Sequence, residues 1–141
     1  MPEFRFSTPI QVRYSDIDAQ GHMNHARYLS FMEEARFHYA RALGLWTDVN
    51  DFNAVGQIVA EASCTYLRPV QIGQTVVVAV RTSRLGTKSL EMAYRLSVEG
   101  VAVATARTVQ VAYDYAAHQS IPIPPAWRTA IAAFEGEMVG A

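Results

Sequence analysis

The chain has 141 residues, 50% of them hydrophobic, and a formal net charge of −1. This length predicts a single domain over residues 1–141, with enough apolar side chains for a core. The 12 basic residues are spread along the chain, so we expect no nucleic-acid-binding surface. We expect neither a membrane span nor a signal peptide, because no apolar run reaches about 20 residues and the N-terminus has no apolar core segment. The single cysteine, Cys64, excludes an intrachain disulfide and favours a reducing, cytoplasmic location.

Apolar and polar residues alternate near the N-terminus, which predicts a first β-strand. The apolar members of this alternation are Phe4, Phe6, Ile10, Val12 and Tyr14. Pro9 lies within the strand and cannot donate a backbone hydrogen bond, so we expect an edge position or a bulge.

A long amphipathic helix is predicted next, because apolar residues recur at steps of three and four. These residues are Tyr28, Phe31, Met32, Ala35, Tyr39, Ala42 and Leu43. Asn24 is a suitable N-cap and Gly44 a suitable C-terminal stop. A helix of about 20 residues is about 30 Å long, which makes it a central element of so small a domain.

After a looser stretch over residues 45–56, the apolar period changes to two and predicts four more strands. On one face of the first of these strands lie Ile58, Ala60, Ala62, Cys64 and Tyr66, and the second strand is marked by Val76, Val78 and Val80. The third is marked by Leu90, Met92, Tyr94, Leu96 and Val98, and the fourth by Val101, Val103, Val109, Val111 and Tyr113. The connections RPVQIGQ, RLGTK and EG are short, so we expect consecutive strands to be antiparallel neighbours. The segment 121–136 predicts a short terminal helix with Pro125 in its first turn.

The predicted order of elements is a strand, a long helix, four antiparallel strands and a short helix. The long helix is the only large partner for the apolar face of the sheet, so the fold class is α+β, with a curved antiparallel sheet wrapped around one central helix. Such a sheet has exposed edges, which proteins commonly cover by pairing. We therefore expect a homo-oligomer.

Polar residues gather just ahead of the long helix, in SDIDAQGHMNHARY, residues 15–28. The wider segment RYSDIDAQGHMNHARYLSFMEEAR resembles the characteristic motif of hotdog-fold acyl-CoA thioesterases, in the branch of 4-hydroxybenzoyl-CoA thioesterase. The shared pattern is an aromatic residue, D-x-D, a glycine, H-x-N and a helix that opens with a tyrosine. The predicted order of elements agrees with that fold over essentially the whole chain.

The resemblance implies that Asp18 is the catalytic carboxylate and that the backbone N–H of His25 holds the thioester oxygen. It also implies an acyl-CoA substrate, no cofactor apart from the coenzyme A of that substrate, and a homodimer or homotetramer with active sites at a subunit interface. The chemistry is reasonable on physical grounds, because a helix N-terminus offers free N–H groups and about half a positive charge to a developing oxyanion. Asp18 would act as a nucleophile or as a base that activates water.

Other residues of the motif allow two interpretations. Asp16 has the ordinary chemistry of a turn or cap, and His22 either contacts substrate or polarises Asp18, or else fixes the turn. Asn24 is expected to cap the helix and thereby to orient the site, and Tyr28 to form core or pocket wall.

Two rival sites use overlapping or neighbouring residues. A metal site built from Asp16, Asp18, His22 and His25 is disfavoured, because their spacing matches no zinc pattern. Glu33, two helical turns after His25, is the position at which a sister group of hotdog thioesterases carries its carboxylate. Those enzymes lack the loop aspartate that this chain has, and a surface ion pair with Arg36 explains Glu33 well, so Glu33 ranks far behind Asp18.

The turn over residues 83–91 resembles the nucleotide-contacting turn of the family. Arg84, Lys88 and Ser89 are therefore expected to contact coenzyme A, with Arg68 a weaker candidate. The alternative interpretation of this turn is a solvated hairpin tip.

Three other functions are compatible with the same fold. A hydratase or dehydratase would commonly use a D-x4-H spacing, and Asp18 and His22 are one residue closer than that. A non-catalytic acyl-CoA binding protein would not need Asp18, and hydrolysis of acyl carrier protein thioesters would require a basic docking face. The sequence leaves aromatic, medium-chain and long-chain acyl groups open.

Overall fold

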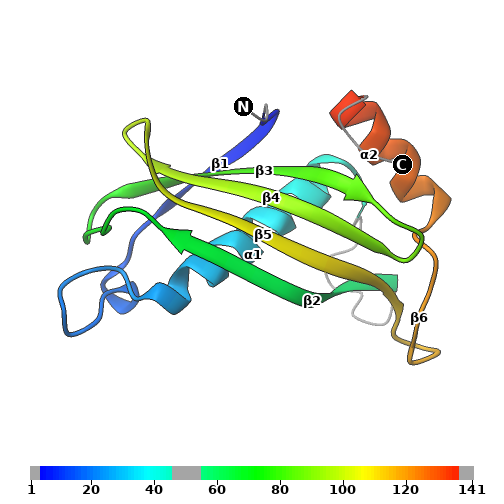
Figure 1. Cartoon of the computed structure of the whole chain (residues 1–141), viewed down its shortest axis with the longest axis horizontal. Helices are drawn as coiled ribbons and strands as arrows, with labels where there is room; N and C mark the ends of the chain where they lie inside the picture. Colours follow the sequence, from blue (N-terminus) through cyan, green and yellow to red (C-terminus); the bar gives the residue numbers. More distant parts are fainter. Residues whose placement is uncertain (1–3, 46–54, 137–141) are drawn as a thin grey trace.

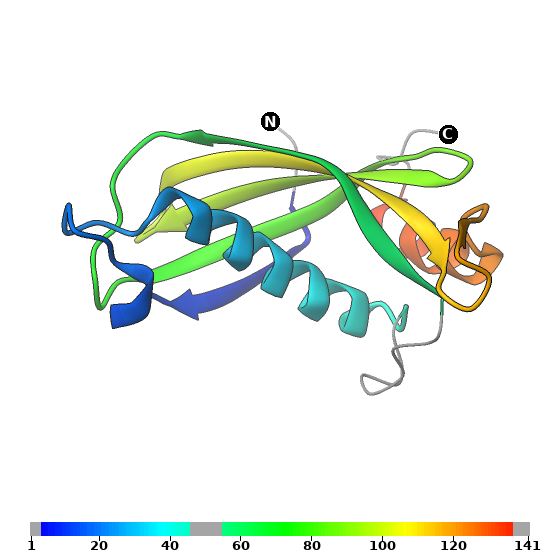
Figure 2. The ribbon, with the colours of Figure 1, turned by 90° about the horizontal axis from the view of Figure 1, so that it is seen from below.

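The computed structural model describes residues 4–45 and 55–136, and its main feature is one curved sheet lying across a long helix (Figures 1 and 2). In chain order the elements are β1 (Phe6–Gln11), the 3-10 turn η1 (Tyr14–Asp16), α1 (His25–Ala42), β2 (Val55–Tyr66), β3 (Thr75–Leu85), β4 (Ser89–Val98), β5 (Val101–Asp114), β6 (Gln119–Ser120) and α2 (Pro125–Glu135). The predicted α+β class and order of elements are confirmed, apart from the short β6. The looser stretch over 45–56 lies largely outside the described residues.

The strand order in the sheet is β1-β3-β4-β5-β2, with β6 paired to β5, and every pairing is antiparallel. The prediction that β2 and β3 are neighbours is therefore wrong. Residues 67–74 can reach about 26 Å when extended, whereas three strand spacings are about 14 Å, so this connection is long enough to cross the end of the sheet. Buried Val70 anchors the crossing, since its carbonyl accepts a hydrogen bond from the Met23 N–H at 2.7 Å. β2 thus becomes an edge strand beside β5.

The core lies between α1 and the concave face of the sheet. The buried side chains of α1 are Tyr28, Phe31, Met32, Ala35 and Tyr39, which are five of the seven predicted positions. The sheet opposes them with Val76, Val78, Val80, Leu90, Met92, Tyr94 and Leu96, all of them buried. Burying each of these larger apolar side chains is worth about 1.5–3 kcal/mol, so the packing of α1 on β3 and β4 fixes where the start of the helix lies.

Both helices begin at the predicted signals, and α1 also ends at its predicted stop. Asn24 is the N-cap of α1, and Gly44 follows the helix with a φ of 75°, a conformation that glycine adopts without steric cost. Pro125 is the first residue of α2. The buried Glu135 at the end of α2 accepts hydrogen bonds from the Tyr39 hydroxyl at 2.7 Å and the Thr82 N–H at 3.0 Å, which ties α2 to α1 and β3.

Two details of the predicted strands are wrong. Tyr14 belongs to η1 and is 84% exposed, because the chain turns after Val12. In β2, a bulge between Val59 and Glu61 changes the alternation, so that Val59 lies on the concave face with Ala62 while Ile58 lies on the outer face.

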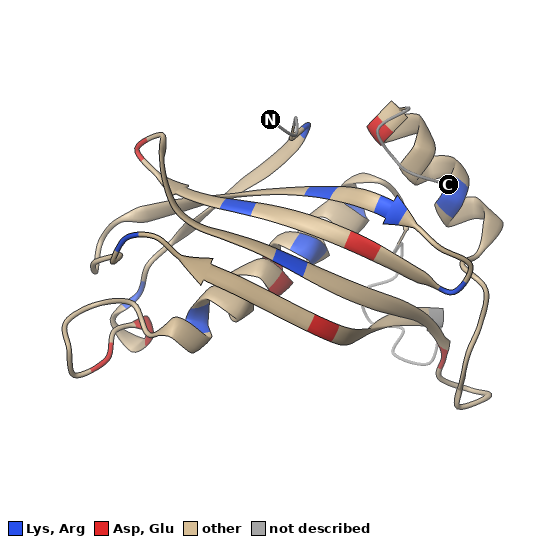
Figure 3. Ribbon diagram, viewed as in Figure 1, with Lys and Arg blue, Asp and Glu red and all other residues tan. Residues whose placement is uncertain are grey.

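Basic and acidic residues are scattered over several elements and do not gather on one face (Figure 3). No helix within the described ranges is long and apolar enough to cross a membrane.

Candidate active site

The segment that carries Asp18 is a tight loop closed by backbone hydrogen bonds. Ile17 and Met23 form an isolated antiparallel bridge, and the Asp18 N–H donates to the His22 carbonyl at 3.1 Å. The Gly21 N–H donates to the Asp18 carbonyl at 3.0 Å. Gly21 has a φ of 81°, a left-handed conformation that favours glycine, which explains the glycine of the motif. The loop therefore holds Asp18 in a defined position ahead of α1.

Asn24 connects the Asp18 carboxylate to the start of the helix. Its Nδ2 donates to Asp18 Oδ2 at 3.2 Å, while its Oδ1 accepts from the Ala26 N–H at 2.9 Å. The other carboxylate oxygen of Asp18 accepts from the Gln20 N–H at 2.9 Å. The expected cap is confirmed, and the same side chain orients Asp18.

The backbone N–H of His25 is available to a ligand. It is the first residue of α1, and within the described part of the chain its N–H donates no hydrogen bond. The positive end of the helix dipole lies at the same place. An oxygen atom that gains negative charge during a reaction would be stabilised there.

Tyr66 at the end of β2 fixes this first turn. Its hydroxyl donates to the His25 carbonyl at 3.0 Å, and its ring meets the Tyr28 ring edge-on with centroids 4.8 Å apart. Tyr66 was not predicted as a site residue. The motif gives no indication of a contact between residues so far apart in the sequence, and only the placement of β2 beside α1 creates it.

The other residues of the motif have distinct surroundings. Asp16 is buried and accepts from the Arg13 N–H at 2.9 Å, with Arg27 Nε at 3.8 Å from its carboxylate, which agrees with the capping interpretation. Tyr28 is buried in the hydrophobic core and does not line the cleft between α1 and β2, and desolvation raises the pKa of its phenol, so it is held as a neutral phenol. His22 is partly buried, and its side chain has no hydrogen bond or ion pair with any residue that the structure describes.

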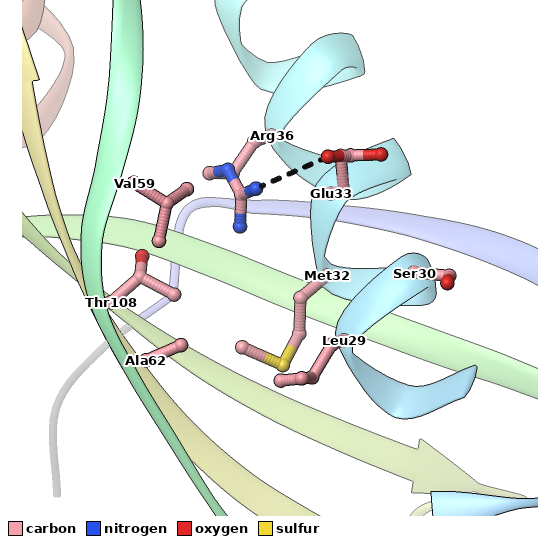
Figure 4. Close-up of a pocket in the computed structure, with 8 residues that line it drawn as sticks. All are labelled: Leu29, Ser30, Met32, Glu33, Arg36, Val59, Ala62 and Thr108. Atoms are coloured by element: carbon pink, nitrogen blue, oxygen red, sulfur yellow. Dashed lines mark ion pairs between the residues drawn. The ribbon is translucent and has the colours of Figure 1, made fainter. Parts of the chain in front are cut away.

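A cleft of about 260 Å³ runs between α1 and the concave side of β2 (Figure 4). Eight residues line it: Leu29, Ser30, Met32, Glu33, Arg36, Val59, Ala62 and Thr108. Glu33 and Arg36 form the expected ion pair, with 4.0 Å between Oε2 and Nη2. The first cleft residue on α1, Leu29, lies about one helical turn beyond His25, so the cleft extends along the helix from near its start.

The structure does not bring Arg84, Lys88 and Ser89 to this site within one chain. They lie around the turn between β3 and β4, which begins after Leu85, ten residues beyond the start of β3 at Thr75, or about 33 Å along the strand. Arg128 of α2 contacts the carbonyl of Gly86 and so holds the turn against the C-terminal segment. Arg68 is exposed and lies in the crossing connection, nearer to the Asp18 loop.

Within residues 4–45 and 55–136, no three metal-ligating side chains come together. In particular, the Asp16 carboxylate turns toward Arg13 and Arg27 and does not share a centre with Asp18.

The sequence and the fold of the chain are similar to those of known thioesterases. The sequence profile of the thioesterase-like superfamily matches residues 12–131. The 1,4-dihydroxy-2-naphthoyl-CoA hydrolase of Synechococcus elongatus is 30% identical over 126 residues, covering 88% of this chain and 91% of that enzyme. The uncharacterized protein YsmA of Bacillus subtilis is 33% identical over 91 residues, covering 64% of this chain but 60% of YsmA. A Thermus thermophilus thioesterase crystallised with coenzyme A and Zn has a TM-score of 0.83 and 33% identity, covering 97% of this chain and 98% of its own.

These matches identify the α+β architecture as the hotdog fold of thioesterases, which confirms the resemblance found in the sequence. The chain belongs to the thioesterase-like superfamily.

Variants of Asn24 should separate its two roles, which are capping α1 and orienting the Asp18 carboxylate. Asn24→Ala removes both hydrogen bonds and should cost about 1 kcal/mol of the free energy of unfolding. Asn24→Ser keeps an oxygen for the cap, but its hydroxyl lies one bond nearer the backbone than Nδ2 and should not reach Asp18, so stability should stay near that of the wild type while the contact with Asp18 is lost. Both variants should lose about 10-fold in kcat for thioester hydrolysis, the scale of one hydrogen bond to a charged group. Urea unfolding and kcat would be measured together, and wild-type kcat in Asn24→Ser would contradict an orienting role.

Proposed function

We propose that this protein hydrolyses acyl-CoA thioesters to free carboxylic acids and coenzyme A, in the cytoplasm, with Asp18 and the His25 N–H as its catalytic groups. One observation carries the proposal: Asn24 joins the Asp18 carboxylate to the helix end whose first N–H is free. A carboxylate and an oxyanion donor are the groups that thioester hydrolysis needs.

The proposed reaction follows from the charges at the site. The carbonyl oxygen of the thioester accepts from the His25 N–H, which stabilises the negative charge of the tetrahedral intermediate. Asp18 removes a proton from water as the new C–O bond forms, or attacks the carbonyl carbon itself. In either route the C–S bond then breaks, and the sulfur leaves as a thiolate, which needs little protonation because thiols are far more acidic than alcohols. In the second route the thiolate leaves behind a mixed anhydride on Asp18, which water hydrolyses to the free acid. No metal or further cofactor takes part in this scheme.

Asp18→Asn should lose at least about 100-fold in kcat while remaining folded, because the amide can neither take up a proton nor attack the carbonyl. The measurement is release of free thiol from a panel of acyl-CoAs, with circular dichroism as the control for folding. Glu33→Gln is the matched variant. If Glu33→Gln is inactive and Asp18→Asn is near wild type, the carboxylate on the helix is the catalytic one.

The acyl group is not fixed by family membership. The Synechococcus relative is named for a dihydroxynaphthoyl thioester. The same panel of aromatic, medium-chain and long-chain acyl-CoAs would define the class of substrate for this protein.

We also propose that the protein works as a homodimer or a homotetramer. β2 is an edge strand of 12 residues, with Ile58 at 40%, Val59 at 42% and Tyr66 at 44% exposure. Proteins rarely leave such a long apolar edge unpaired. Antiparallel pairing of β2 with β2 of a second copy would cover this edge and extend the sheet.

Sedimentation velocity at micromolar concentration should show little monomer. Specific activity should fall on dilution below the dissociation constant of the dimer, because Tyr66 at the helix start lies on the paired edge. A monomer that keeps full specific activity would contradict the proposal.

A two-fold pairing of β2 would also bring the turn with Lys88 to the active site of the second copy. The Tyr66 end of β2 lies at the helix start, whereas Ile58 near its other end is level with Ser89, since both pair with Val111. A two-fold axis through the middle of β2 exchanges these two ends. The turn of one copy then lies at the same end as the Asp18 loop of the other, where coenzyme A would enter.

Lys88→Ala should raise KM for acyl-CoA about 2- to 5-fold with little change in kcat, because an exposed charge contact is worth about 0.2–1 kcal/mol in both ground and transition states. The effect should be larger at low salt. An acyl pantetheine, which lacks the nucleotide phosphates, is the control substrate, and its KM should not respond. Equal responses of both substrates, or none, would make the turn a solvated hairpin tip.

A further inference from the structure

The cleft near the helix start contains a largely buried arginine whose ion pair is weak. Arg36 lies at the end of the cleft away from His25, and its side chain is only 15% exposed. Among the described residues its ion-pair partner is Glu33, which is 79% exposed and 4.0 Å away, so solvent screens the attraction between them. A largely buried charge with only a solvent-exposed partner is costly, and an anion in the cleft would reduce that cost.

The groups behind Arg36 are neutral and hold it in place. Arg36 Nη1 donates to the Tyr94 hydroxyl at 3.1 Å, Tyr94 and Thr108 hydroxyls are 2.6 Å apart, and Thr108 donates to Gln110 Oε1 at 2.6 Å. Burial raises the pKa of the Tyr94 phenol although Arg36 nearby lowers it, so Tyr94 remains uncharged. The hydrogen bonds therefore fix the guanidinium without supplying a negative charge.

The remaining surface of the cleft is mainly apolar. Leu29 and Met32 form the wall on α1, and Val59 and Ala62 form the wall on β2 (Figure 4). Arg36 is 11 residues after His25, about 16 Å along the helix axis, and helical side chains lean back toward the N-terminus. An acyl chain that starts at the His25 N–H would run along apolar walls and end at the guanidinium.

We propose that Arg36 binds a carboxylate at the far end of the acyl group, so that the preferred substrates are coenzyme A monothioesters of dicarboxylic acids. The planar guanidinium matches a carboxylate with two parallel hydrogen bonds. This inference rests on the proposed function, because it takes the cleft to be the acyl site of the thioesterase.

The test compares matched substrates. Succinyl-, adipoyl- and suberoyl-CoA are each paired with the straight-chain acyl-CoA of the same carbon number. The quantity measured is kcat/KM for the carboxylated substrate divided by kcat/KM for its straight-chain partner. In the wild type at least one pair should favour the carboxylated substrate. Arg36→Met should lower that ratio at least about 30-fold, the scale of losing one partner of a buried charge pair, and Arg36→Lys should lower it less.

Arg41→Met is the matched control, since Arg41 lies on an exposed part of the same helix, and it should leave the ratio unchanged. Thermal unfolding would show that each variant is folded, and Arg36→Gln replaces Arg36→Met if the latter is not. A ratio of one or less in every wild-type pair, or an Arg36→Met variant that affects both substrates alike, would overturn the inference. So would a preference for hydroxylated aromatic acyl-CoAs that Arg36→Met leaves unchanged.

A binding measurement keeps this inference separate from the proposed function. If no acyl-CoA is hydrolysed, the thioesterase proposal fails, but calorimetry with suberate and octanoate still tests the cleft. Suberate should bind more tightly than octanoate, and Arg36→Met should abolish the difference. Equal affinity for the two acids in the wild type would overturn the carboxylate site.

Discussion

The proposed active site depends on the two hydrogen bonds of Asn24. A carboxamide carries a donor and an acceptor on one short side chain, so the same residue can cap a helix and hold a carboxylate. A serine hydroxyl would cap the helix but lies one bond nearer the backbone and would not reach Asp18 as Nδ2 does, and aspartate would repel Asp18. With asparagine, the carboxylate is tied to the helix end that carries the proposed oxyanion donor, and packing of α1 on the sheet fixes both of them.

The second constraint is the path of the chain between β2 and β3. Because residues 67–74 cross the end of the sheet, β2 lies beside β5 and its last residue reaches the start of α1. If β2 paired with β3, neither the contact of Tyr66 with the His25 carbonyl nor the cleft against Val59 and Ala62 would exist. The crossing also packs Val70 under the Asp18 loop, so one connection supports the loop and builds the cleft wall.

Interactions between residues close in the sequence are enough to predict the long helix and the Asp18 loop, but not the arrangement of strands in the sheet. The apolar spacing of α1, the cap at Asn24 and the glycine at position 21 act within a few residues, so the sequence predicts them correctly. The neighbour of β2 and the bulge near Val59 depend on long-range pairing, which alternation does not report. In β5 the apolar Val109 and Val111 face outward, while Thr108 and Gln110 face the core.

The inward orientation of polar Thr108 and Gln110 in β5 has a physical explanation, and it involves the cleft residue Arg36. Polar side chains are tolerated in a core when their hydrogen bonds are satisfied, and Thr108 and Gln110 satisfy each other and Tyr94. The chain of hydrogen bonds ends at Arg36, so its charge is fixed in the cleft with only the exposed Glu33 as an ion-pair partner. Two positive groups then lie along this side of α1, the helix dipole at His25 and, beyond it in the cleft, the guanidinium of Arg36. An alkyl acyl group complements only the first of these, through the oxyanion that forms in the reaction. An acyl group that ends in a carboxylate complements both, and its second contact is already present in the ground state, so it would add to affinity more than to turnover.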